Sequence, residues 1–286
     1  MHVALGVQVA LNSEASDGNC DIRGALAYEH LTQIMLVADP TGWLRSVYNS
    51  AQASVVECPD SESVWYALLR SAEILGAEKV RISRTEVMEY RKAVESAWNQ
   101  IPHSARIATI RARLLGTVES AESAVSLDPR YAPAHIALAR AQLTTGNTSG
   151  AQETMRYLAH DRSPGVHVLL ARIEFAQGNY KGAIEQVKRE RSMTPNPVEP
   201  MILPDEVAVR DSEEVAGLSY LQLGNYHRAA IFLVSATVRG SESGVRSLNN
   251  ADPRLLNALR QLANDPSAPA TSRDVASHFL SPEIRR

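Results

Sequence analysis

The stretch AQGNYKGAIEQV, residues 176–187, decides the fold that the sequence predicts. A helical pattern runs into Gly178 and Asn179, and a second helical pattern resumes through Ala183. Glycine readily adopts the left-handed backbone conformation that ends a helix, and a small alanine lets a returning helix pack closely on the first. The stretch therefore predicts two antiparallel helices joined by a tight turn.

The same pattern occurs twice more along the chain, in LTTGNTSGAQETM (143–155) and in LQLGNYHRAAIFL (221–233). The turn glycines are 32 and then 46 residues apart, so the second interval contains an insertion. A helix pair that recurs at such a period indicates a solenoid, in which each pair buries its apolar face against its neighbours. The equivalent positions are Gly146, Gly178 and Gly224 in the turns and Ala151, Ala183 and Ala229 in the second helices.

These residues resemble the tetratricopeptide repeat (TPR) family, in which an apolar helix A, a glycine turn, a small alanine in helix B and a late proline recur. The matching positions in residues 164–195 are Leu170, Ala171, Gly178, Tyr180, Ala183 and Pro195. Those in 132–163 are Leu138, Ala139, Gly146 and Ala151, and those in 210–240 are Gly217, Tyr220, Gly224, Tyr226, Ala229 and Ala236. The sequence departs from the family at His135 and His167, where an aromatic residue is usual, and at Thr148, which replaces the turn tyrosine.

The resemblance implies an all-α, right-handed α-solenoid (superhelix) of antiparallel helix-turn-helix repeats. Residues 1–103 read as degenerate N-terminal repeats, 104–240 as TPR-like repeats, and 241–286 as a C-terminal capping helix and tail. The prolines of the 196–209 insertion forbid a continuous helix there. Its apolar triplet Met201-Ile202-Leu203 is expected to dock on the chain itself, either over the edge between repeats or inside the concave face.

Charge and composition exclude several classes of partner. The net charge is −3, so no global basic field favours nucleic acid, and no apolar run approaches the roughly 20 residues of a membrane span. Cys20 and Cys58 are too few for a disulfide framework, and we interpret them as two reduced thiols in preference to the alternative of a single bridge. With no basic segment before the apolar run at 3–11, the sequence predicts a reducing, cytoplasmic setting.

No catalytic or cofactor motif stands out. The sequence has no nucleophile elbow, phosphate loop, dinucleotide-binding glycine motif or metal-ligand spacing. His135 and His167 occupy one repeat position, which favours packed rings over metal ligands. We therefore predict a chain that is not an enzyme and that has no cofactor.

In the TPR family, helix A lines the concave face, and the resemblance implies that ligands bind there. Arg140 and Arg172 each lie six residues before a turn glycine, with apolar residues one turn to either side. Arginine can hold a carboxylate through two parallel hydrogen bonds, so this pattern favours a peptide with acidic and apolar side chains. The predicted partner-binding residues are Arg106, Arg113, Ile136, Arg140, Leu143, Val168, Arg172, Phe175, Glu214, Leu218 and Leu221.

The predicted function is a non-catalytic scaffold or adaptor that binds a partner protein or peptide. Two alternatives stay open. The same arginines could pair with acidic residues of neighbouring repeats rather than with a partner. The array could also be the regulatory or substrate-recruiting arm of an enzyme complex whose chemistry belongs to another chain.

Overall fold

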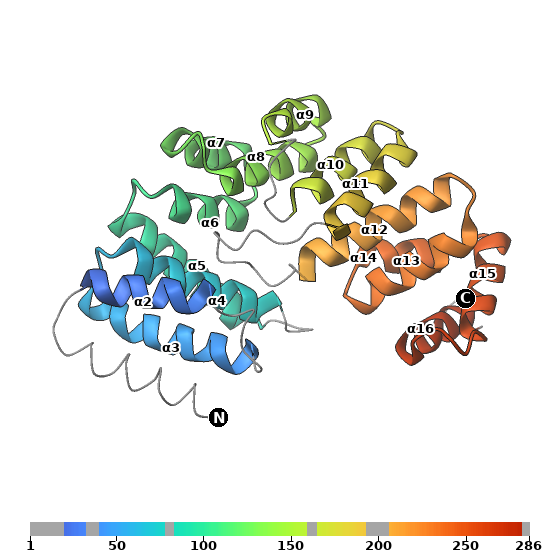
Figure 1. Cartoon of the computed structure of the whole chain (residues 1–286), viewed down its shortest axis with the longest axis horizontal. Coiled ribbons are helices and arrows are strands. Elements are labelled where there is room, and N and C mark those ends of the chain that lie inside the picture. Colours follow the sequence, from blue (N-terminus) through green and yellow to red (C-terminus); the bar gives the residue numbers. More distant parts are fainter. Residues whose placement is uncertain (1–19, 33–39, 78–82, 159–164, 193–205, 282–286) are drawn as a thin grey trace. The chain divides into compact units, whose positions relative to one another are not determined.

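The computed structural model describes residues 20–32, 40–77, 83–158, 165–192 and 206–281. Fifteen helices, α2 to α16, span these residues, and none of them forms a β-strand (Figure 1). The helices follow one another as antiparallel hairpins, so the predicted all-α solenoid class is confirmed. The apolar run at 3–11 and residues 196–205 of the insertion lie outside the described residues.

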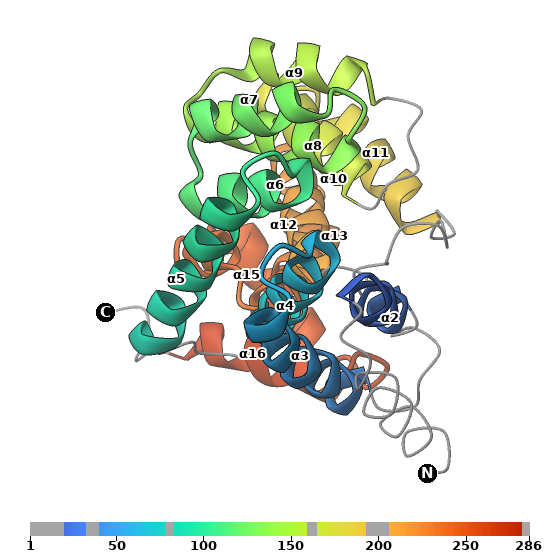
Figure 2. The same ribbon diagram turned by 90° about the vertical axis from the view of Figure 1, so that its left-hand side faces the viewer.

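The described helices divide between two compact units, and the division falls between Asn147 and Thr148. In the first unit the even-numbered helices contact one another in sequence, α2 with α4, α4 with α6, and α6 with α8. These are the A helices of the repeats, and Figure 2 shows α6, α7 and α8 lying against one another. The unit comprises α2 (Cys20–Thr32), α3 (Pro40–Glu57), α4 (Glu62–Ala77), α5 (Arg84–Gln100), α6 (Ala105–Leu115), α7 (Val118–Leu127) and α8 (Ala132–Thr144).

The second unit repeats this arrangement, with A helix α10 contacting α12 and α12 contacting α14. Its C-terminal part contains three helices where the sequence indicated a single cap and a tail. The predicted division into 1–103, 104–240 and 241–286 stays a prediction. The unit comprises α9 (Thr148–Arg156), α10 (Val166–Ala176), α11 (Tyr180–Ser192), α12 (Glu206–Gln222), α13 (Tyr226–Val238), α14 (Glu242–Asn249), α15 (Pro253–Ala263) and α16 (Ala270–Leu280).

The three turn glycines share one backbone conformation, as the sequence predicts. Gly146, Gly178 and Gly224 have φ values of 80°, 80° and 73°, in the left-handed region. At Gly178 the amide donates to the carbonyl of Phe175 at 3.0 Å, and the next amide donates to Glu174 at 2.8 Å. The same pair of hydrogen bonds closes the other two turns, which identifies all three as equivalent glycine C-caps.

The small residues after these turns are fully enclosed. Ala151, Ala183 and Ala229 each expose 0% of their surface. Ala183 packs in a cluster with Ala171 of α10 and with Val215 and Ala216 of α12. A side chain larger than a methyl group would displace these neighbours, so the predicted reason for alanine at this position is confirmed.

Each unit has a core of its own. In the first, Leu44, Leu69 and Ile107 bring together α3, α4 and α6. In the second, the largest cluster joins α13, α15 and α16 through residues such as Leu233 and Leu259.

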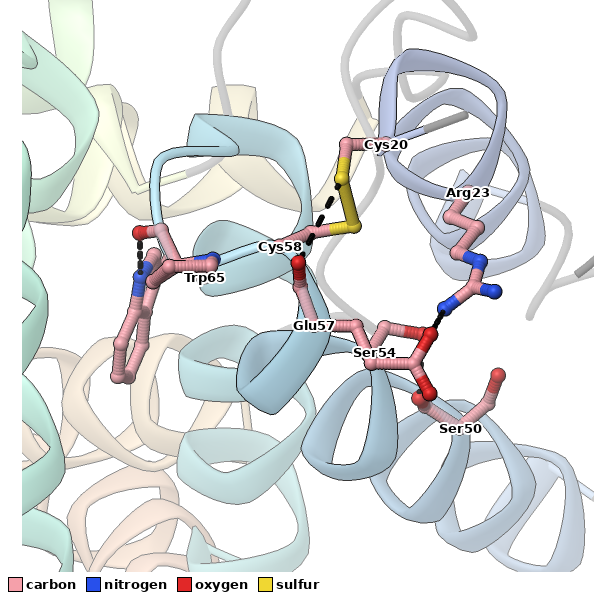
Figure 3. The surroundings of a disulfide bond; sticks show 8 residues. Cys20, Arg23, Ser50, Ser54, Glu57, Cys58 and Trp65 are labelled. Carbon is pink, nitrogen blue, oxygen red and sulfur yellow. Dashed lines mark hydrogen bonds and ion pairs between the residues drawn. A yellow bond between two sulfur atoms is a disulfide. The ribbon is translucent and has the colours of Figure 1, made fainter. Parts of the chain in front are cut away.

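The interpretation of the two cysteines as thiols is wrong, because Cys20 and Cys58 form a disulfide with their Cα atoms 5.4 Å apart (Figure 3). The bond joins the first residue of α2 to the corner between α3 and α4. The two cysteines are 38 residues apart in sequence, and only the packing of α2 against α3 and α4 brings them together. The prediction of a reducing compartment loses the support that it drew from free thiols.

Candidate partner-binding surface

The predicted partner-binding residues all lie on A helices, but the two units divide them. The first unit holds Arg106 and Arg113 on α6 and Ile136, Arg140 and Leu143 on α8. The second unit holds Val168, Arg172 and Phe175 on α10 and Glu214, Leu218 and Leu221 on α12.

In the first unit, one carboxylate, that of Glu73 on α4, gathers arginines from several A helices. Arg70 of the same helix forms an ion pair with it. Arg113 of α6 approaches it from the next A helix, with Nη2 3.0 Å from Oε2 of Glu73. The positive charge of Arg140 on α8 also helps to lower the pKa of Glu73. The unit therefore carries a belt of guanidinium groups centred on one acid.

The charges around Glu73 alter its protonation equilibrium. Burial by itself would raise the pKa of Glu73, but the positive charges of Arg113 and Arg70 outweigh it, so that the pKa lies below its ordinary value. For Arg70, burial works to lower the pKa, but the charge and hydrogen bond of Glu73, together with Tyr66 and Tyr90, raise it above its ordinary value. Burial, and then Glu73, raises the pKa of the neighbouring Tyr90 phenol. The carboxylate stays ionised and the phenol stays neutral over the whole physiological range.

The belt is only partly covered by protein. The side chain of Arg70 is 5% exposed, whereas those of Arg113 and Glu73 are 21% and 30% exposed. The Nε of Arg113 is buried and donates to no atom of the described structure. Arg106 places its guanidinium 5.4 Å from the centre of the Tyr66 ring, which aligns it on the face of α4.

Sequence reasoning missed Arg70 and Glu73, although one signal was present. Arg70 lies six residues before Gly76, as Arg140 and Arg172 lie six residues before their turn glycines. The repeat that contains α4 otherwise matches the family only late, at Ala97 and Pro102, so the register of the inner face was not extended to it.

In the second unit the predicted arginine has acidic neighbours within the chain. Arg172 of α10 lies 3.2 Å from Asp211 and 3.8 Å from Glu214, both on α12. Ser241, at the start of α14, donates from Oγ to Oε2 of Glu214 at 2.6 Å. Arg172 and Arg113 thus each form an ion pair with an acid of a neighbouring repeat, which is one of the alternatives that the sequence left open.

Other buried acids of α12 are paired in the same way. Glu213 is 4% exposed and receives Arg191 at 3.3 Å and Arg239 at 3.1 Å. Asp211 is also paired with Arg210 at 3.2 Å. The predicted residue Glu214 and its neighbours Asp211 and Glu213 are thus paired with arginines of the second unit itself.

The predicted apolar residues differ in exposure. Val168 is buried, with 1% exposed, and therefore offers a partner no surface. Phe175 is half-buried, with its ring centre 5.4 Å from that of Tyr180. Ile136 and Leu143, as well as Leu218 and Leu221, are also half-buried.

Both repeat histidines have partners in the chain. A ring nitrogen of His135 lies 2.9 Å from the carbonyl of Pro129, and Nδ1 of His167 lies 2.8 Å from Oε1 of Gln186. Among the described residues, no group of three or more His, Cys, Asp or Glu side chains is arranged to hold a metal ion. Nor does any helix among them have the length and apolar character that crossing a membrane requires.

Comparisons with known proteins bear on the fold. No family model and no curated protein matches the sequence. The crystal structure of PilW, a widely conserved type IV pilus biogenesis factor, matches with a TM-score of 0.51 and 18% identity, over 80% of this chain and 98% of that one. A chain of the APC/C hetero-tetramer Cut9–Hcn1 matches with a TM-score of 0.54 and 14% identity, over 90% of this chain and 52% of that one. This chain thus spans about half of the Cut9–Hcn1 chain.

At these identities the likeness concerns the fold alone. Both neighbours are TPR-type helical-repeat structures. Together with the three equivalent glycine turns, the buried alanines and the rows of contacting A helices, they show that the chain has a TPR-like helical-repeat fold.

Proposed function

We propose that the chain is a non-catalytic scaffold that binds an acidic and partly apolar segment of a partner protein on the A helices of its first unit. The carrying observation is the belt of Arg70, Arg113 and Arg140 around a single carboxylate, that of Glu73. The positive charge of Arg113, whose side chain is 21% exposed, would attract a second acidic group at this place. Arginine suits this role because its fork of N–H donors matches a carboxylate.

The first unit is a better place for acid recognition than the second. Arg172 faces Asp211 and Glu214, so an incoming carboxylate would have to displace or repel these two acids. In the first unit, Glu73 is the acid shared by Arg70 and Arg113. In this proposal Arg172 stabilises the packing of α10 on α12 and leaves carboxylate recognition to the first unit.

Apolar residues next to the belt complete the proposed surface. Ile136 and Leu143 lie on α8 on either side of Arg140 in sequence, about one helical turn away, and both are half-buried. Their exposed portions would contact apolar side chains of the partner and supply affinity, while the arginines select acidic sequences and speed encounter. Arg106 extends the positive surface along α6.

The experiment compares two labelled peptide probes of equal length, one alternating Glu and Leu and the other alternating Lys and Leu, by fluorescence anisotropy at low and high salt. The proposal expects binding of the acidic probe only, weakening with salt because the exposed charges are screened. Arg140→Glu should weaken binding of the acidic probe at least tenfold. Arg45→Glu, an exposed position on α3 of the same unit, is the matched control and should leave it unchanged.

Equal binding of the two probes would refute acid selectivity. Equal effects of the two substitutions would place the binding outside the A helices of the first unit. Circular dichroism melting of each variant separates a loss of binding from a loss of folding.

A further inference from the structure

The disulfide lies at a corner that other interactions hold in place. Cys58 is 3% exposed, and its amide donates to the carbonyl of Ser54 at 2.8 Å. One residue further on, the carbonyl of Pro59 accepts from Nε1 of Trp65 at 2.7 Å, which ties the corner to α4 (Figure 3). The α3–α4 corner therefore holds Cys58 in place, and the disulfide attaches Cys20 of α2 to this corner.

Helix α2, at the other end of the bond, packs against α3 and α4. Of its described apolar side chains, Ala27 is buried and Leu26 is half-buried. Gly24 allows a close approach to α4, because a Cβ atom there would lie 2.8 Å from Oγ of Ser61. Arg23, whose side chain is 12% exposed, forms an ion pair with Glu57, whose side chain is 64% exposed, so solvent screens the pair on the Glu57 side. Ordering a helix of 13 residues costs conformational entropy, and a covalent bond at its first residue reduces that cost.

We propose that the chain folds and works in an oxidising compartment, and that the Cys20–Cys58 disulfide is the tether that keeps α2 packed on α3 and α4. Both cysteines of the chain are used in this bond. Disulfides persist in oxidising compartments, whereas cysteine thiols are kept reduced in the cytosol. The tether keeps α2 close to its docking site, so α2 closes again whenever it opens. Reduction by a dithiol transfers two electrons and two protons to the bond, releases two thiols and frees α2.

The first test measures the state of the cysteines in the protein isolated from its native source. Cells are lysed into acid, and the protein is denatured with excess iodoacetamide and weighed intact by mass spectrometry. The proposal expects no carbamidomethyl group without a reductant and two after reduction. Two groups without a reductant would overturn the oxidising-compartment inference.

The second test measures what the bond does, by hydrogen exchange of the full-length protein before and after reduction. The amides of α2 should exchange at least tenfold faster in the reduced protein, and those of α6 and α7 should not change. The double variant Cys20→Ser, Cys58→Ser should behave like the reduced protein. Arg23→Ala, which removes the ion pair but keeps the disulfide, should behave like the oxidised protein.

Unchanged exchange in α2 after reduction would overturn the tether. So would a uniform increase throughout the first unit, because the bond would then stabilise the whole unit rather than one helix. Neither result depends on the peptide-binding experiment above, since the proposed binding residues lie on α4, α6 and α8.

Discussion

At the scale of single residues, the structure separates what local sequence can encode from what it cannot. Gly178 was predicted from its neighbours along the chain, and its φ of 80° follows from the helix that it ends. Glu73 was not predicted, because its importance comes from Arg113, 40 residues away, and from the nearly buried Arg70 beside it. A carboxylate in the A helix of a degenerate repeat has no local signature of such partners.

Glu73→Gln should lower the free energy of unfolding at pH 7 by about 2–3 kcal/mol, because it leaves the nearly buried Arg70 without its countercharge. The pKa of Glu73 is lowered in the folded state, so its stabilisation is present above the unfolded value of about 4.3 and is lost as the pH falls through the folded pKa. The difference between wild type and variant should therefore shrink below about pH 4. Urea unfolding at pH 7 and at pH 3 measures it.

The control is Glu89→Gln, which removes an exposed acid from its pair with Lys92. If Glu89→Gln lowered the free energy of unfolding as much as Glu73→Gln does, the buried ion pairs of Glu73 would contribute no more than an exposed pair.

At the scale of helices and hairpins, the repeat pattern predicted most of what the structure shows. The glycine turn, the alanine behind it and the helix on either side recur as predicted, because they depend on contacts within a few residues or between adjacent helices. The pattern said less about the C-terminal region. Ser241 there accepts from the amide of Gly244 at 2.8 Å and so begins α14, in a region for which the sequence indicated only a capping helix and a tail. Capping serines are common in loops as well, so the sequence alone does not decide between the two.

Ala183→Leu should destabilise the packing of α11 on α10 and α12. The position is 0% exposed and lies against Ala171 and Ala216, so three added carbon atoms force neighbouring side chains to move. We expect a loss of about 1–3 kcal/mol, measured by thermal and urea unfolding. Ala176→Leu, at the exposed end of α10, should change stability by less than about 0.5 kcal/mol. Equal losses at the two sites would show that Ala183 is not a close-packing position.

At the scale of the whole molecule, the described residues form two units with separate cores. In repeat arrays stability is approximately a sum of terms from each repeat and its nearest neighbours. Each unit should therefore open locally without the other. This behaviour cannot be predicted from the sequence of a single repeat.

Leu69→Ala and Leu233→Ala test this, because both side chains are fully buried, one in each unit. Each should cost about 2–5 kcal/mol. Hydrogen exchange should accelerate mainly in α3, α4 and α6 for the first variant, and mainly in α12, α13 and α15 for the second. The same exchange pattern from both variants would show that the chain opens as a single unit.

The sequence by itself determined the helical class, the hairpin turns and the small residues behind them, because these follow from backbone preferences and from packing between neighbours in the chain. Only the tertiary structure decided that Cys20 bonds to Cys58 and that Arg113 and Arg172 meet Glu73 and Asp211. A disulfide or an ion pair forms where distant segments come within a few ångströms of each other. The number of residues between two positions does not determine their distance in space, which is set only when the helices pack.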